Sequence, residues 1–124
     1  MELSLQPEPL AICRLEEASP IPVWALEAVP LHVSRTAGEL SVVCPAVRVP
    51  DGVRVEGPWQ AIAVQGPLDF ALTGVLASLA GPLAEAGISL FAISTFDTDY
   101  ILVRAADVAR AQAVLAAAGH TFLP

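Results

Sequence analysis

Charge is scarce in this chain, and positive charge is scarcest. Only 15% of the 124 residues are charged, and six basic residues face thirteen acidic ones, which leaves a net charge of −7. A surface of this sign repels the phosphate backbone of nucleic acids and the headgroups of anionic membranes, so we expect binding to neither. The negative net charge favours a ligand that carries a cationic group.

Cysteine is also rare, and its spacing gives no sign of a metal centre. Cys13 and Cys44 are the only two, no CxxC motif occurs, and the histidines His32 and His120 are far apart in sequence. A zinc site therefore lacks support, and we expect neither a metal nor another cofactor. Because both cysteines lie in apolar runs, LAICRL and LSVVCP, we interpret them as core thiols on strands; a disulfide or metal pair is the alternative.

Long apolar stretches are missing as well. The N-terminus lacks a basic region followed by an apolar one, and the longest candidate, residues 68–88, is broken by Gly74, Gly81 and Pro82. A membrane span needs about 18 uninterrupted apolar residues, so we expect a cytoplasmic protein. Apolar residues are nevertheless abundant, at 55% of the chain. This favours a large core and a face buried between two copies, a homodimer.

The second half of the chain has the clearer secondary-structure pattern. Leucines and a valine at three- and four-residue spacing predict a helix over residues 67–87, and an alanine-rich stretch before Gly119 predicts a second one. Runs of β-favouring residues predict the strands 59–66, 88–95, 99–104 and 120–124. The order of these elements is β-α-β-β-α-β.

The first half repeats this order more weakly. It contains predicted strands at Leu10–Leu15 and 53–56, a short helix over Val23–Ala28, and a hairpin of residues 31–36 and 40–44. We therefore predict an α+β protein of two tandem ferredoxin-like βαββαβ units, residues 1–57 and 58–124, with antiparallel sheets and helices on one face. The repeat has a period of about 60 residues.

One segment resembles a known family. GPLDFALTGVLASLAGPLAEAGISLFAISTFDTDYILV (residues 66–103) is similar to the ACT domain, in the tandem form of the CASTOR arginine sensors and of small bacterial ACT proteins. The hairpin SRTAGELSVVCP resembles the matching hairpin of the preceding half-domain. The resemblance implies a ferredoxin-like fold, amino-acid binding between ACT units, and a regulatory role without catalysis. Because two ACT-like units are present rather than four, a complete site would need a second copy of the chain.

The resemblance also implies where a ligand would bind. The family's binding segments fall on the turn before the first helix and on the connection between the next two strands. In this sequence those positions are Gly66, Pro67, Leu68, Asp69, Ser94, Thr95, Phe96 and Asp99.

Physical chemistry gives an independent reason to consider these residues. The start of the helix predicted at Leu68 and Asp69 would offer unpaired N–H groups to a carboxylate, and Asp99 would offer a negative charge to an amine. These two poles match a zwitterionic amino acid. Simpler roles stay open, because Asp69 is typical of a helix start and Asp97 of a turn.

The other candidate residues have structural interpretations. Ser94 and Thr95 could bond locally at a strand end, and Phe96 could pack in the core. Trp24 and Trp59 are expected in the core or an interface, and His120 on the surface.

The sequence leaves more than one class of function open. The first hypothesis is an amino-acid-binding regulatory protein, and the second is a structural or protein-interaction module that pairs with a partner protein. An enzyme has the least support, because GxSxG, P-loop and HExxH motifs are absent and no nucleophile adjoins a histidine.

Overall fold

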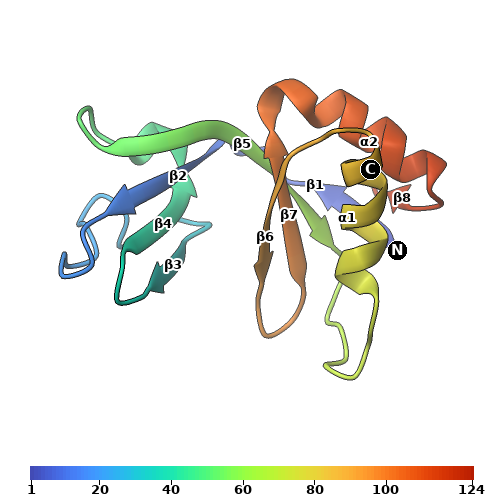
Figure 1. Ribbon diagram of the computed structural model, residues 1–124, viewed down its shortest axis with the longest axis horizontal. Coiled ribbons are helices and arrows are strands. Elements are labelled where there is room, and N and C mark those ends of the chain that lie inside the picture. Colours follow the sequence, from blue (N-terminus) through green and yellow to red (C-terminus); the bar gives the residue numbers. More distant parts are fainter. The chain divides into compact units, whose positions relative to one another are not determined.

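The computed structural model describes residues 1–124, which divide into two compact units. The N-terminal unit is residues 8–59, and the C-terminal unit combines residues 1–7 with residues 60–124. The expected domains were 1–57 and 58–124. The first seven residues instead join the C-terminal unit, because strand β1 (Glu2–Leu5) pairs there with two other strands (Figure 1).

The N-terminal unit is a four-stranded antiparallel sheet. Its strands are β2 (Leu10–Leu15), β3 (His32–Arg35), β4 (Leu40–Pro45) and the first part of β5 (Arg54–Val64), in the order β3-β4-β2-β5. A short 3-10 helix, η1 (Ala46–Arg48), follows β4. Alternate residues of β2 and β4 build the core: Ala11, Cys13, Leu40, Val42 and Cys44. The predicted hairpin is therefore confirmed.

The short helix predicted over Val23–Ala28 is wrong. The segment forms successive turns, in which the N–H groups of Ala25 and Ala28 donate to carbonyls three residues earlier. Proline explains the difference, because Pro20, Pro22 and Pro30 surround a stretch too short to propagate a helix. The turns still place Ala25 and Ala28 in the core.

The C-terminal unit is a five-stranded sheet with two helices. Its strands are β1, the second part of β5, β6 (Leu90–Ser94), β7 (Asp99–Arg104) and β8 (Thr121–Phe122), in the order β6-β7-β5-β1-β8. The β1–β8 pair is parallel, whereas β1–β5 and β6–β7 are antiparallel. The helices are α1 (Val75–Glu85) and α2 (Val108–Ala117), the latter preceded by the 3-10 helix η2 (Ala105–Asp107).

Both helices cover the same face of this sheet. Leu79 and Leu83 of α1, and Ala111 and Leu115 of α2, pack on alternate residues of the strands, such as Ile101 and Val103. This agrees with the predicted α+β class and with helices on one face. Neither helix is long and apolar enough to cross a membrane.

Helix α1 begins later than its leucine pattern predicts. The helix expected over residues 67–87 starts at Val75, because Gly74 adopts a left-handed φ of 76° and the preceding residues form a loop. Asp69 stabilises that loop: its Oδ1 accepts from the N–H of Ala71 (2.8 Å) and its carbonyl from the N–H of Leu72 (3.0 Å). Leu72 is consequently 53% exposed rather than packed in the core.

Two further expectations need correction. The strands predicted at 53–56 and 59–66 are one strand, β5, which continues through Gly57 and Pro58. His120 is buried rather than on the surface: its Nδ1 lies 3.2 Å from the N-terminal amine of Met1, and its Nε2 lies 3.0 Å from the carbonyl oxygen of Ser78.

The two cysteines are buried free thiols in the core of the N-terminal unit, as predicted. Burial, reinforced by the neighbouring Cys44, raises the pKa of the Cys13 thiol to about 12, and burial also raises the pKa of Cys44.

Because only the thiolate attacks a disulfide reagent, we predict that both thiols of the native protein react with Ellman's reagent at the rate of unfolding. Rapid labelling of native protein would contradict this.

The same pKa shift predicts a loss of stability in alkali. Above pH 9.0, the ordinary pKa of the thiol, the unfolded chain releases the Cys13 proton while the folded chain keeps it. The free energy of unfolding should therefore be unaffected by this group below pH 9.0 and fall as the pH rises toward about 12. Urea titrations of wild type and Cys13→Ala along this range test it, since the variant should show a shallower fall. Parallel pH profiles would contradict it.

Candidate functional site

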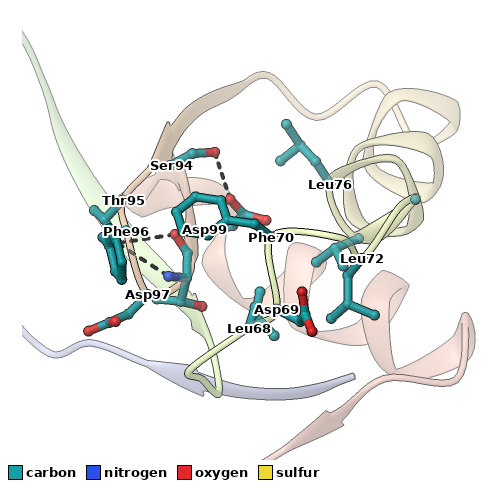
Figure 2. A pocket seen from close by; sticks show the side chains of 13 residues that line it. Leu68, Asp69, Phe70, Leu72, Leu76, Ser94, Thr95, Phe96, Asp97 and Asp99 are labelled. Carbon is teal, nitrogen blue, oxygen red and sulfur yellow. Dashed lines mark hydrogen bonds between the residues drawn. The ribbon is translucent and has the colours of Figure 1, made fainter.

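A pocket opens in the C-terminal unit between the loop that leads into α1 and the turn that joins β6 to β7 (Figure 2). Its volume is about 270 Å³. The lining comes from these two segments and the first turn of α1, namely Leu68, Asp69, Phe70, Leu72, Gly74, Val75, Leu76 and the residues from Ser94 to Asp99. The chain holds no cluster of three or more side chains suited to a metal ion.

Six of the eight residues expected at a ligand site line this pocket: Leu68, Asp69, Ser94, Thr95, Phe96 and Asp99. The other two, Gly66 and Pro67, do not line it. Gly66 instead permits a close approach, because a Cβ at this position would lie 3.0 Å from the carbonyl oxygen of Asp97 and 3.1 Å from Cβ of Thr98. A side chain there would push the loop away from the turn.

Hydrogen bonds tie the loop to the β6–β7 turn. The N–H of Leu68 donates to the carbonyl of Asp97 (2.6 Å), and Thr98 Oγ1 donates to the carbonyl of Val64 (2.6 Å). Within the turn, the N–H of Thr95 donates to the carbonyl of Thr98 (2.8 Å), and Thr95 Oγ1 also bonds to the backbone of Thr98. The Thr95 hydroxyl therefore stabilises the turn through bonds to its backbone.

Asp99 is the half-buried carboxylate of the pocket. It begins β7 directly opposite Ser94, the last residue of β6. Ser94 Oγ donates to Asp99 Oδ1 at 2.6 Å, which fixes the carboxylate in the cavity (Figure 2). Asp69 and Asp97 add two exposed carboxylates to the lining, which contains no basic side chain. The residues that line the pocket therefore carry a net negative charge.

The positive pole lies at a different place from the one expected. The N–H of Leu68 is already bonded to Asp97, and Leu68 and Asp69 are not helical. The helix start is at Val75, where Gly74 provides no side-chain cap and the first turn holds no acidic residue. The first N–H groups of an α-helix have no intrahelical partner and carry partial positive charge, so the available donors lie at residues 75–77.

An exposed aromatic pair forms the apolar rim. Phe70 and Phe96 meet edge to face, with ring centroids 5.0 Å apart and planes at 84°. Their exposures are 74% and 80%, so the alternative that Phe96 packs in the core is wrong. The sequence interpretation missed Phe70 and Leu72 as lining residues because it placed them inside a helix rather than in the loop before it. It also missed Leu76, which does lie in the first turn of α1. The signal that would have exposed them is Gly74, a residue able to end the loop and begin the helix.

Comparison with known proteins identifies the fold family. The family model of the ACT domain matches residues 54–117, and the model of an N-terminal domain matches residues 8–52. The solved structure of an Agobacterium tumefaciens protein is 40% identical, with a TM-score of 0.91 over 98% of this chain and 91% of that chain. A Clostridium acetobutylicum aspartate kinase, described as allosteric, is 11% identical with a TM-score of 0.68, over 90% of this chain and 33% of that chain.

A curated relative is similar over a shorter segment. The human protein named "Cytosolic arginine sensor for mTORC1 subunit 1" is 48% identical over 46 residues, which are 36% of this chain and 14% of that protein. This chain therefore spans only a small part of the curated relatives it matches. The resemblance of residues 66–103 to the ACT domain is confirmed. Because the ACT model covers more than half of the sequence, the chain belongs to the ACT domain family.

Proposed function

We propose that this protein is a non-catalytic regulatory protein that binds an amino acid in the pocket between the α1 loop and the β6–β7 turn. The observation that carries the proposal is the pairing of the half-buried Asp99 carboxylate with an uncapped helix start in one cavity. A ligand with both a cationic and an anionic group would satisfy both poles at once.

The two poles would bind opposite ends of the ligand. The α-carboxylate would accept hydrogen bonds from the first N–H groups of α1, where the helix dipole favours an anion. The cationic group would donate to the carboxylate of Asp99, whose Oδ1 already accepts a hydrogen bond from Ser94 Oγ. Phe70 and Phe96 would cover the aliphatic part of the ligand and can also attract a cation.

Charge and size narrow the ligand class. Three carboxylates and no basic side chain line the cavity, which favours an amino acid with a cationic side chain. The volume of about 270 Å³ is just below the range of about 300–1,000 Å³ typical of drug-sized ligands, which suits a small metabolite. The human relative is named an arginine sensor, so arginine is the first ligand to test. That relative is named cytosolic, and a cytoplasmic location is part of the proposal.

A protein-interaction module is the competing proposal. It is favoured by the two exposed phenylalanines, which a partner protein could cover. A thermal-shift screen against the twenty amino acids separates the two, because a ligand of the native state raises the melting temperature by mass action. If no amino acid raises it, the amino-acid proposal fails and the interaction module is preferred.

Asp99→Asn should weaken ligand binding without unfolding the protein. The amide keeps the shape and can still accept from Ser94, but it removes the charge that pairs with the ligand's cation. Losing a charge-assisted hydrogen bond costs about 1.5–3 kcal/mol, which is roughly a tenfold or greater loss of affinity. Calorimetric titration of wild type and variant with the amino acid found in the screen measures it.

Asp97→Asn is the matched control for Asp99→Asn. It makes the same change of charge in the same pocket lining, but Asp97 is an exposed turn residue that contributes its backbone carbonyl to the structure. Its affinity loss should be much smaller. Equal affinities of wild type and Asp99→Asn would show that Asp99 serves only the turn.

We also propose that the protein is a homodimer, in which a second copy could complete the site. Strand β6 (LFAIS) is an edge of the C-terminal sheet and carries neither charge nor proline, the features that usually prevent edge pairing. Light scattering should give twice the chain mass of 12.9 kDa at micromolar concentration. Ala92→Lys, at an exposed position of this edge, should shift the protein to monomer. A monomeric wild type would remove the dimer proposal.

A further inference from the structure

The two units contain the same hairpin. Strands β4 and β7 are both six residues long and begin at Leu40 and Asp99, and each is followed by a three-residue 3-10 helix that begins at Ala46 or Ala105. The number of residues between Leu40 and Asp99 equals the number between Ala46 and Ala105. The hairpins therefore correspond residue by residue.

The turns of these hairpins have the same hydrogen bond. The N–H of Thr36 donates to the carbonyl of Glu39 (3.0 Å), as the N–H of Thr95 donates to that of Thr98 (2.8 Å). The residue pairs that flank the turns are Arg35 with Leu40 in one unit and Ser94 with Asp99 in the other. Arg35 thus takes the position of Ser94, and Leu40 that of Asp99.

These two replacements change what the hairpin does. Asp99 points its carboxylate into the pocket, whereas Leu40 is fully buried in the core of the N-terminal unit. Ser94 bonds to Asp99, whereas Arg35 extends to the segment that follows β2, where Nη1 donates to the carbonyl of Glu17 and Nη2 to that of Ser19 (2.8 Å). This segment corresponds in fold order to the loop after β5, which forms the opposite wall of the pocket.

We propose that the N-terminal unit carries a latent cation-binding site, a degenerate copy of the pocket, which the guanidinium of Arg35 fills from within the chain. Two backbone carbonyls accept hydrogen bonds from the two terminal nitrogens of one guanidinium, so this pair of acceptors uses the fork of that group. The C-terminal hairpin therefore borders an open pocket, whereas at the corresponding place in the N-terminal unit a tethered cation occupies the acceptors. This site is inferred from the correspondence of the two hairpins and from the two bonds of Arg35, and it does not require that an amino acid binds in the C-terminal pocket.

Removal of the tether should make the latent site accessible to free guanidinium. Arg35→Ala should lower the melting temperature, because it leaves the Glu17 and Ser19 carbonyls without their donor. Low-millimolar guanidinium chloride should raise the melting temperature of this variant relative to sodium chloride at equal ionic strength. It should give no such rise in wild type, whose site is filled.

Arg14→Ala is the matched control. Arg14 is a nearby arginine whose Nη2 donates to one backbone carbonyl, that of Gly38 (3.1 Å), and whose Nη1 lies 3.7 Å from Oε1 of Glu16, so it lacks the pair of backbone acceptors. Guanidinium should not restore its stability. A second variant, Arg35→Lys, keeps the charge without the fork and should melt between wild type and Arg35→Ala.

Three results would overturn the proposal. If Arg35→Ala has the same melting temperature as wild type, the bonds of the Arg35 guanidinium do not stabilise the fold. A destabilised Arg35→Ala variant with no specific recovery in guanidinium would show a structural bond without a cation site. Equal recovery of Arg14→Ala would show a general effect of the salt.

Discussion

The pocket depends on one close approach of two backbone segments, at Gly66. The absence of a side chain there lets the loop after β5 reach the β6–β7 turn, where Leu68 donates to Asp97 and Thr98 donates to Val64. These two bonds hold the two walls of the cavity, the loop and the turn, in place. The turn positions Asp99 at one end of the pocket. The loop ends at Gly74, where the start of helix α1 forms the other end of the pocket.

Much of the fold could be predicted because its signals are local. The hairpins follow from alternating side chains and turn residues, and Gly87 and Gly119, both at positive φ, end the two helices where expected. The start of α1 could not, because Leu68 and Leu72 fit the helical period although Gly74, the local bonds of Asp69 and the bond from Leu68 to Asp97 hold this segment in a loop. Strand β5 was divided at Gly57 and Pro58 for a similar reason: a register shift opposite Leu10 and Ile12 accommodates them within the sheet.

Part of the lining of the candidate pocket could be named from the sequence, but the geometry of the pocket could not. The segment from Ser94 to Asp99 is a hairpin turn in sequence and in structure, so its side chains could be named in advance. The helix donors could not, since their place depends on where Gly74 ends the loop. Burial of His120 was also missed, because its contacts, Met1 and Ser78, are distant in sequence and no local pattern connects them.

Comparison of the two hairpins explains why only one unit retains a polar cavity. A carboxylate can occupy the first position of the second hairpin strand only if water, a ligand or a donor satisfies it. At Asp99 the late start of α1 leaves open space, and Ser94 supplies a donor. At Leu40 the proline-bounded turns bring Ala25 and Ala28 onto the sheet, so the position is sealed and requires an apolar side chain. The covering segment, more than the hairpin itself, decides whether a site can form.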